Sequence, residues 1–365
     1  MNSKRRDFIK TTALASGGAL LFGCSNNEEQ KSVNINMNKT YSWKMVTAWA
    51  PHFPLLGEGA DQLAKDIESM SGGRIKIQVY GGGELVPPLE TFDAVSQGVA
   101  EMGHSASYYW AGKAPAAQFF TSLPFGMNTS QMNAWLYNGG GIELWHELYQ
   151  QFNLIAFPAG NTGAQMGGWF NKEINSLNDV RGLKMRFPGI GGKVINKAGG
   201  SAVLSAGSEI YTNLERGVID ATDWIGPYHD YLMGFHEIAK YYYYPSWAEP
   251  TGVLELTINK SVYESLPDEL KQIIIQAAEA ANIKMFGLFK KNNAEYYSKI
   301  KNETKVQFKK FPEDVLTSFR KFAKEAIDEI VESNSMSKKI YPSYKNFHEM
   351  MYQWDSIVEP NYETL

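Results

Sequence analysis

The chain has 365 residues, with 35 Lys and Arg against 39 Asp and Glu, so its formal net charge is −4. This length is sufficient for two domains of ordinary size, and the near balance of charge gives no indication of a nucleic-acid partner. Cys24 is the only cysteine, which excludes an intramolecular disulfide and leaves the rest of the chain without a thiolate for a metal centre.

Residues 1–24, MNSKRRDFIKTTALASGGALLFGC, have the layout of an export signal: a charged start, a short apolar segment and small residues before the cysteine. Arg5 and Arg6, followed by DFIK, resemble a twin-arginine signal, which addresses folded proteins for export. The alternative is an ordinary basic start of a signal peptide. Either interpretation predicts a periplasmic or other extracytoplasmic protein.

The end of this segment, LFGC, resembles a lipoprotein processing site in which Cys24 becomes the lipidated N-terminus. Phe22 is bulkier than the residue usually found at that place. Residues 25–39 are polar and lack a periodic apolar face, so we expect them to form a flexible tether. Membrane anchoring through a lipid on Cys24 is therefore an open alternative to free export.

Strand and helix patterns alternate from residue 41 onwards. YSWKMVTAW reads as a strand, EGADQLAKDIESMSGG as an amphipathic helix and RIKIQVY as a second strand, and LIAFPAG, LKMRFPG and VIDATDW continue the scheme further along the chain. Alternation of this kind indicates crossover connections and a mainly parallel sheet. The chain beyond residue 268 is mostly helical.

These patterns predict an α/β protein of two lobes. We expect lobe I to comprise 40–161 plus about 250–285, and lobe II to comprise 162–249 plus about 310–365. A long helix over about 268–302 is expected to cross between the lobes.

Two segments repeat one another, AVSQGVAEMGHS at 94–105 and NLERGVIDATDW at 213–224. In each, Gly98 or Gly217 stands where a helix should end, because glycine enters the left-handed conformation without steric penalty. Glu101 or Asp220 follows in the next short strand. The carboxyl ends of such strands are where open α/β sheets bind ligands, which predicts a cleft between the lobes. The alternative is that the repeat only reflects a sequence pattern that α/β units have in common.

Motifs for catalysis and for organic cofactors are missing from the sequence. There is no G-x-G-x-x-G opening a helix, no phosphate loop, no G-x-S-x-G and no H-E-x-x-H. We therefore expect a protein that is not an enzyme and that holds no organic cofactor.

Polar residues in aromatic or glycine-rich surroundings are the candidates for a site. Arg186 ends a predicted strand, and its planar guanidinium matches a carboxylate through two parallel hydrogen bonds. The alternatives are a surface arginine or a salt bridge between lobes. Asp223 lies beside Trp224 and Glu249 lies near Trp247, and two acids with an amide oxygen such as that of Gln165 would form a site for a hard cation.

With these residues in view, the chain resembles the solute-binding proteins of tripartite ATP-independent periplasmic (TRAP) transporters, in the branch that binds 2-oxo monocarboxylates or lactate together with a metal cation. The resemblance covers about residues 41–360. It is carried by GGGELVPPLETFDAVSQGVAEMGHSASYYWAGK, GNTGAQMGGWF, RGLKMRFPGIGGKV and LERGVIDATDWIGPYHDYLMGF running on to YYPSWAEPTG.

The resemblance implies a type II-like periplasmic-binding-protein fold with a hinged cleft between the lobes and long C-terminal helices. It implies that Arg186 pairs with the substrate carboxylate. The other residues of the implied ligand pocket are Asn161, Gln165, Tyr108, Tyr109, Trp224 and Phe187.

The resemblance also implies that a cation is held by Gln165, by Asp223 with the backbone of Trp224, and by Glu249. The branch commonly has Glu where this chain has Asp223. The shorter side chain brings the cation closer to the backbone or changes its identity, so sodium and calcium both stay open.

The function implied is capture of a small 2-oxo or 2-hydroxy monocarboxylate, such as pyruvate or lactate, and its delivery to TRAP permease subunits in the membrane. Some relatives of this branch pair through C-terminal helices, so a homodimer is a further alternative. Two other functions stay open from the sequence: an exported enzyme acting on a small organic acid, and a lipoprotein that reports a ligand to a receptor.

Overall fold

The computed structural model describes residues 39–358. The expected export signal at 1–24, the lipidation site Cys24, nearly all of the expected tether at 25–39 and residues 359–365 lie outside this range. Within 39–358, no helix is both long and apolar enough to cross a membrane.

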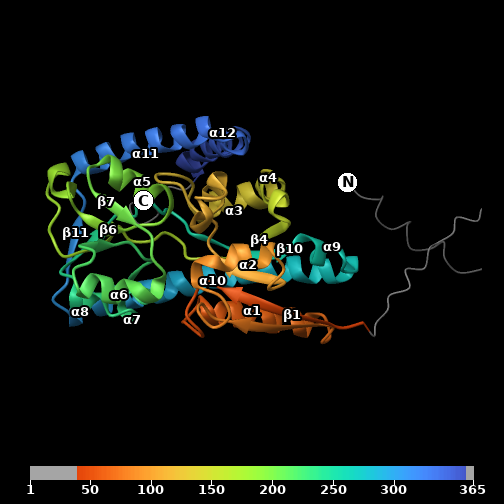
Figure 1. The fold of residues 1–365 in the computed structure, drawn as a ribbon. Helices are drawn as coiled ribbons and strands as arrows, with labels where there is room; N and C mark the ends of the chain where they lie inside the picture. The colour runs from red at the N-terminus through yellow and green to blue at the C-terminus, as the bar shows by residue number, and fades with distance from the viewer. Residues whose placement is uncertain (1–38, 359–365) are drawn as a thin grey trace, which may run out of the picture. The chain divides into compact units, whose positions relative to one another are not determined.

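One five-stranded sheet forms the first lobe (Figure 1). Its strands, in the order β2-β1-β3-β10-β4, are β1 (Tyr41–Thr47), β2 (Ile75–Tyr80), β3 (Met102–Ser105), β4 (Leu154–Asn161) and β10 (Val253–Asn259). Strand β1 runs parallel to both β2 and β3. Every residue of β10 is buried, because its sequence VLELTIN lies in the middle of the sheet with both faces covered.

A six-stranded sheet forms the second lobe. Its strands, in the order β11-β9-β5-β8-β6-β7, are β5 (Gly168–Phe170), β6 (Lys184–Arg186), β7 (Ser201–Val203), β8 (Ala221–Thr222), β9 (Tyr241–Tyr244) and β11 (Gln307–Lys310). Strand β6 runs parallel to β7 and β8, so the ends of β6 and β8 meet at one edge.

The expectation of mainly parallel sheets is wrong for one strand in each sheet. Strand β10 is antiparallel to β3 and β4, and β5 is antiparallel to β8 and β9. Both strands directly follow a passage of the chain from one sheet to the other, β4 to β5 and β9 to β10. Strand β11 also follows such a passage, from β10 through α10, yet it runs parallel to β9, so the passage between sheets does not by itself set the direction of a strand.

Helices cover the two sheets. They are α1 (Gly57–Met70), α2 (Thr91–Ser96), α3 (Thr129–Asn138), α4 (Gly141–Tyr149), α5 (Gly189–Lys197), α6 (Gly207–Glu215), α7 (Pro227–Leu232), α8 (Phe235–Ile238), α9 (Lys260–Glu264), α10 (Asp268–Glu303), α11 (Glu313–Ser333) and α12 (Ser335–Val358). Short 3₁₀ turns lie at Pro88–Glu90, Ser107–Trp110, Pro115–Phe120, Gln150–Phe152 and Leu177–Val180.

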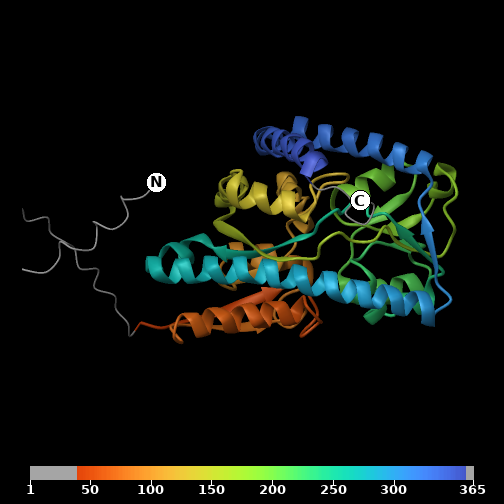
Figure 2. The same cartoon turned by 180° about the vertical axis from the view of Figure 1, so that it is seen from behind.

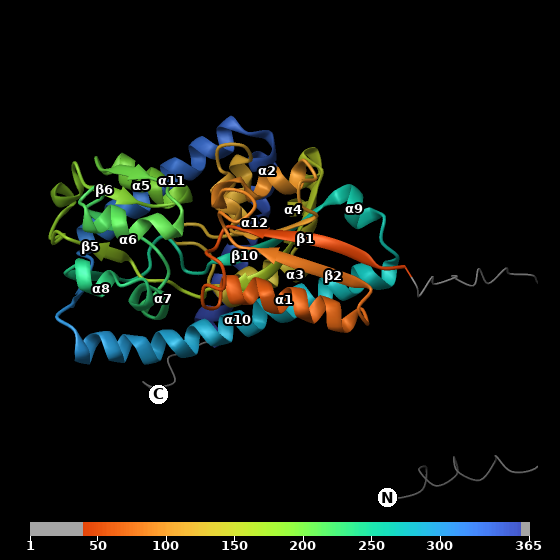
Figure 3. The same cartoon turned by 60° about the horizontal axis from the view of Figure 1, so that its bottom comes forward.

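Helix α10 contacts both lobes along its 36 residues, which correspond to a length of about 54 Å. It packs against β4 and α1 of the first lobe and against α7 of the second. Figures 2 and 3 show the helix passing from one set of elements to the other. Helix α10 therefore connects the lobes, in addition to the segments of chain that pass between the two sheets.

The long C-terminal helices are confirmed, and they divide between the lobes. Helix α11 packs on α5 of the second lobe, whereas α12 packs on α3, α4 and the Pro115–Phe120 turn, which belong with the first sheet. The backbone N–H of Met127 donates to the hydroxyl of Tyr344 at 2.8 Å, and Gln131 Nε2 donates to Asp355 at 2.7 Å. The sequence had placed all of 310–365 with lobe II, and for α12 these contacts differ from that expectation.

The two repeated segments share one backbone conformation at the end of a helix. Gly98 and Gly217 have φ of +77° and +69°, and the following residues, Val99 and Val218, each donate to the carbonyl five positions back. The two carboxylates then accept from the neighbouring parallel strand: Glu101 from Lys44 N at 2.7 Å, and Asp220 from Lys184 N at 3.1 Å. Both acids therefore stabilise strand pairing. Each precedes in the sequence the residues that are predicted to line the cleft.

Aromatic side chains fill the core of each lobe and also join the lobes. In the first lobe, Phe120 stacks between Trp135 at 5.5 Å and Trp145 at 4.8 Å. A separate cluster combines residues near the first sheet, such as Trp49, with Trp169 and others of the second lobe. The described structure therefore has its lobes in apolar contact.

Candidate ligand and cation site

Arg186 is the buried cation at the edge of the second sheet. It ends β6, its residue is 1% exposed, and its guanidinium donates to two backbone oxygens, Ser205 O at 3.3 Å and Asp223 O at 2.9 Å. The carbon of the guanidinium lies 5.2 Å from the ring centre of Trp224. Nη2 has no hydrogen-bond partner among residues 39–358. These contacts exclude the solvated surface arginine that the sequence left open.

Two carboxylates lie in the electrostatic field of this arginine. Asp223 follows β8 directly, Glu249 lies in the passage from β9 to β10, and both are buried. Burial raises the pKa of both carboxyls, their mutual repulsion adds to this for Glu249, and the charge of Arg186 opposes it. A positive ion beside these oxygens would favour their charged forms.

Gln165 is tied to Glu249 through the backbone. Its N–H donates to the Glu249 carbonyl at 3.1 Å, and its side-chain Nε2 donates to Thr162 Oγ1 at 3.2 Å. Among residues 39–358, Oε1 of this amide has no hydrogen-bond partner. Gln165 therefore offers an acceptor oxygen to a ligand or cation.

The unpartnered buried atoms at these positions fall into two chemical sets. Three are nitrogen donors: Arg186 Nη2, Trp224 Nε1 and Asn161 Nδ2. Three are oxygen acceptors: Gln165 Oε1, Asp223 Oδ2 and Glu249 Oε2. Buried polar atoms normally have partners, so the donors fit an anion and the acceptors fit a hard cation.

The oxygen set contains two carboxylates and one amide. Across residues 39–358, no cluster of three or more His, Cys, Asp and Glu side chains is placed to hold a metal. Amide and carboxylate oxygens suit sodium, calcium or magnesium better than zinc or copper. The residues predicted to bind a cation therefore fit one of the hard ions.

Asn161 and the two tyrosines frame the same region. Asn161 ends β4, and its Oδ1 accepts from Gly163 N at 2.8 Å and from Thr251 Oγ1 at 3.1 Å, which directs Nδ2 away from these partners. Tyr108 and Tyr109 pack edge to face at 4.9 Å. Burial raises the pKa of Tyr109, while the nearby charge of Arg186 opposes this shift.

A small cavity brings residues of both lobes together. Its lining includes Trp49, Tyr108, Tyr109, Gln165 and Trp224. The lobe I strand end and the lobe II loop therefore face one space, as the rule for strand ends predicts.

Phe187 lies at the margin of this group. Its ring packs on Trp247 at 5.5 Å within the core of the second lobe, and a Cβ on Gly191 would lie only 2.3 Å from it. Phe187 also borders a narrow gap beside Tyr108 and Glu249. Its main contacts are thus with the core, and of the predicted ligand residues it is the one least directed to the free polar atoms.

Trp49 was missed by the sequence analysis as a residue of the cleft. It follows β1 by two positions, and its indole Nε1 donates to Nδ1 of the fully buried His104 at 2.8 Å. The other nitrogen, His104 Nε2, then donates to the Ala159 carbonyl at 3.2 Å. The position just beyond a strand end was the signal that could have identified Trp49.

One hydrogen bond crosses directly between the lobes. His229 on α7 donates from Nε2 to the carbonyl of Pro54, in the loop before α1, at 2.5 Å. Phe53 packs on the same imidazole at 4.7 Å, and Phe289 of α10 lies at 4.8 Å. The imidazole is buried, and desolvation lowers its pKa to about 3.

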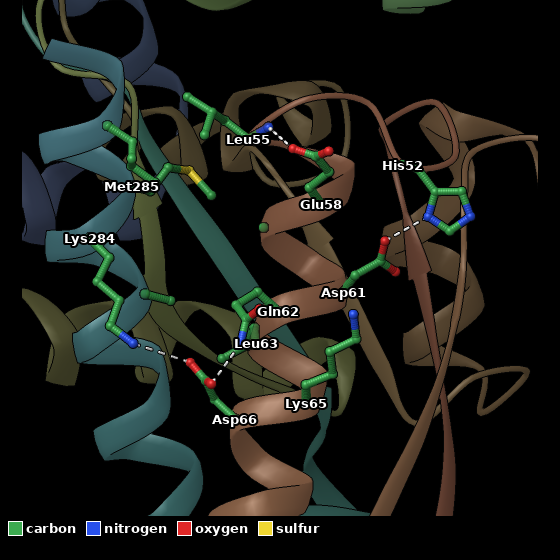
Figure 4. A pocket seen from close by; sticks show the side chains of 13 residues that line it. His52, Leu55, Glu58, Asp61, Gln62, Leu63, Lys65, Asp66, Lys284 and Met285 are labelled. Atoms are coloured by element: carbon green, nitrogen blue, oxygen red, sulfur yellow. Dashed lines mark hydrogen bonds and ion pairs between the residues drawn. The ribbon is translucent and has the colours of Figure 1, made fainter. Parts of the chain in front are cut away.

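A larger groove lies between α1 and α10 (Figure 4). His52 pairs with Asp61 at 2.7 Å, and Lys284 pairs with Asp66 at 3.4 Å across it. None of the predicted ligand or cation residues lines this groove. Of the residues with unpartnered buried atoms, Gln165 and Trp224 line the small cavity between the lobes, and Glu249 borders the narrow gap beside Phe187.

The protein has two α/β lobes that are joined by connecting segments and closed over buried polar atoms. This is the architecture of a solute-binding protein of the periplasmic type. The family model for bacterial extracellular solute-binding protein, family 7 (DctP), matches residues 45–334. The chain belongs to this family, which confirms the resemblance to TRAP solute-binding proteins.

Sequence and structure relatives agree. The monocarboxylate 2-oxoacid-binding periplasmic protein of Nostoc sp. is 39% identical over 363 residues, which cover 99% of this chain and 98% of the relative. The TRAP solute-binding protein of Pseudoalteromonas atlantica, solved with sodium and pyruvate, is 40% identical with a TM-score of 0.85, over 88% of this chain and 98% of that one. The protein of Colwellia psychrerythraea, solved with calcium and pyruvate, gives the same values.

A third similar structure comes from Bordetella bronchiseptica. It is 36% identical with a TM-score of 0.86, covers 88% of this chain and 96% of that chain, and is a dimer in which calcium and picolinate occupy one site and the other is apo. These similarities confirm the expected two-lobed fold.

The contact of His229 with Pro54 predicts a dependence of stability on pH. A histidine with a folded pKa of about 3 and an unfolded pKa of 6.5 stabilises the protein fully above pH 6.5 and loses this contribution as the pH falls. At pH 5 the loss should be about 2 kcal/mol relative to pH 7.5. Urea unfolding of His229→Gln, whose amide still donates, should lack this part of the decrease.

His229→Leu separates the hydrogen bond from the titration. It leaves the Pro54 carbonyl without its donor, so we expect about 1–3 kcal/mol of destabilisation already at pH 7.5, where His229→Gln stays near wild type. Equal stability of the Leu variant and wild type at pH 7.5 would contradict a role for the bond between the lobes.

Proposed function

We propose that this protein captures a small 2-oxo or 2-hydroxy monocarboxylate, such as pyruvate or lactate, together with a sodium or calcium ion. The observation that carries the proposal is the buried guanidinium of Arg186 with an unpartnered Nη2. Pyruvate binding by the similar proteins of P. atlantica and C. psychrerythraea supports it. Binding would involve no conversion of the solute.

Arg186 is the proposed anchor of the carboxylate. Nη2 supplies a charged donor, and Asn161 Nδ2 and Trp224 Nε1 are available for the remaining oxygens of the acid. A buried charge attracts a carboxylate strongly because water does not screen it. Tyr108 and Tyr109 would exclude water from the same space.

The proposed cation ligands are Gln165 Oε1, the carboxylates of Asp223 and Glu249, and the backbone of Trp224. The cation supplies positive charge that offsets the two buried carboxylates and the carboxylate of the solute. Arg186 meanwhile keeps the Asp223 carbonyl in place through its Nη1 bond. The affinities for the ion and for the acid are therefore expected to be linked.

Closure of the lobes follows from differential affinity. Arg186 and Asp223 belong to the second lobe, whereas Tyr108 and Trp49 belong to the first, so the solute gains all its contacts only when the lobes meet. We infer that the closed form docks on TRAP permease subunits. We further infer extracytoplasmic location, with a lipid anchor if Cys24, outside the described residues, is processed.

Replacement of Arg186 tests the anchor. Arg186→Ala should lower the affinity for pyruvate by about 100-fold or more, because it removes one partner of a buried charge pair. Arg186→Lys should recover only part of this, since an ammonium lacks the planar fork. Isothermal titration calorimetry measures both, with the exposed Arg216→Ala as the matched control. Wild-type affinity in Arg186→Ala would refute the anchor.

Removal of one carboxylate charge tests the cation site. Glu249→Gln keeps the shape of the side chain but should lower calcium affinity by about tenfold or more, because affinity follows the number of charged ligands. By linkage, the factor by which calcium raises pyruvate affinity should equal the factor by which pyruvate raises calcium affinity, in this variant as in wild type. Exposed Glu215→Gln serves as the control. Failure of sodium and calcium alike to alter pyruvate affinity in wild type would remove the cation from the proposal.

We also propose that two copies pair through α12. Its last two turns expose Tyr352, Trp354 and Ile357, which are 67%, 58% and 76% accessible. Sedimentation of Trp354→Glu/Ile357→Glu should give a monomer where wild type gives a dimer, because the pair would place charges in an apolar contact. Val218→Glu, at an exposed apolar position of the second lobe, is the control. A monomeric wild type would contradict the pairing.

A further inference from the structure

Asp230 is a fully buried carboxylate on α7 that accepts four hydrogen bonds. Oδ1 accepts from the backbone N–H groups of Ile225 at 3.2 Å and Gly226 at 3.1 Å. Oδ2 accepts from Trp169 Nε1 at 2.8 Å and from the hydroxyl of Tyr242 at 2.6 Å. One oxygen thus faces a loop, and the other faces strands β5 and β9 of the second sheet.

The loop held by Oδ1 is the one that carries Asp223 and Trp224. Its other bonds run to the rest of the site: Asp223 N donates to Arg186 O at 3.0 Å, and the Ile225 carbonyl accepts from Met166 N at 3.0 Å. The two N–H groups that donate to Asp230 belong to the two residues directly after Trp224. Without an acceptor they would be buried and unpaired, and the loop would have no fixed attachment on that side.

The part of Asp230 that faces the sheet is equally well fixed. Trp169 and Tyr242 stack on each other at 4.0 Å, with 16° between their planes, and both are fully buried. Their donors therefore hold Oδ2 at a defined place in a rigid core. Because the carboxylate is held in place by the core, the hydrogen bonds that its other oxygen accepts also hold the loop in place.

We propose that Asp230 is a positioning residue of the cation site. It anchors the loop that precedes α7 to the second sheet, and this loop carries the Asp223 carboxylate and the Trp224 backbone. This inference rests on the proposed function, because it concerns the same cation ligands. Asp230 itself contacts the loop and is not counted among the ligands.

A second buried carboxylate separates this role from ordinary structural stabilisation. Glu255 on β10 is also fully buried and accepts from Ser105, Trp110 and Tyr149 at 2.9, 2.6 and 2.7 Å. All its partners are side chains, and none belongs to the loop that carries the cation ligands. Glu255→Gln is therefore a matched control for loss of a buried charge, and Tyr242→Phe is a control within the Asp230 network that leaves the loop bonds in place.

Hydrogen exchange of the protein without solute or cation tests the anchoring directly. In Asp230→Ala, the amides of Ile225 and Gly226 should exchange at least about tenfold faster than in wild type, while Tyr242→Phe and Glu255→Gln leave them unchanged. Unchanged exchange of these two amides in Asp230→Ala would overturn the inference. This readout requires no ligand, so it is independent of the proposed function.

Asp230→Leu supplies a second variant, which leaves no cavity, if the Ala variant does not fold. Its side chain has nearly the shape of the aspartate but no acceptor oxygen. The N–H groups of Ile225 and Gly226 lose their acceptor in this variant, so the loop should again exchange faster. Protection equal to wild type in this variant would count against the inference in the same way.

Titration of calcium and pyruvate then tests the consequence for binding. We expect a decrease of about 10- to 100-fold in calcium affinity for Asp230→Leu, as is typical when a residue that orients metal ligands is removed. Tyr242→Phe and Glu255→Gln should stay within about threefold of wild type. Wild-type calcium affinity in Asp230→Leu, with pyruvate still bound by all variants, would reject the inference alone. Loss of binding in wild type itself would reject the proposed function, and the inference with it.

Discussion

The burial of the Arg186 guanidinium is the constraint on which the other features of the cleft depend. A guanidinium cannot lose its proton at accessible pH, and a buried charge is stable only when polar groups replace its hydration. Two backbone carbonyls, the face of Trp224 and the nearby carboxylates provide this replacement. The carboxylates are in turn disfavoured by burial, which a cation offsets. In the proposed function, the charges of the ion and the solute add to those of the arginine and the acids.

The passages between the lobes explain why this set responds to closure. Asn161 ends β4, Gln165 lies between β4 and β5, and Glu249 lies between β9 and β10, so all three belong to the segments that connect the two sheets. Arg186 and Asp223 come from the second sheet, and Tyr108 and Trp49 come from the first. A movement of one lobe against the other thus changes the relation between the residues proposed to bind the ion and the residues proposed to cover the solute.

Local sequence signals predicted much of this arrangement. Periodicity gave the strands and helices, glycine gave the helix ends at 98 and 217, and the position beyond a strand end identified Arg186 and Asp223. The direction of β5 and β10 could not be predicted, because strand sense depends on tertiary pairing, which no local pattern in the sequence records. The pairs Trp49 with His104 and Asp230 with Trp169 depend on tertiary contact, and no spacing in the sequence encodes them. The role of Phe187 in the ligand pocket, which the resemblance implies, stays a prediction: its ring packs on Trp247 in the core and borders a gap with Glu249.

A crystal structure of the protein with pyruvate and calcium, with anomalous scattering used to locate the ion, tests the central claim most directly. The proposed assignment predicts the pyruvate carboxylate within hydrogen-bond distance of Arg186 Nη2. It also predicts calcium at about 2.3–2.6 Å from oxygens of Gln165, Asp223 and Glu249. Pyruvate bound without contact to Arg186, or an ion located away from those three side chains, would contradict the assignment.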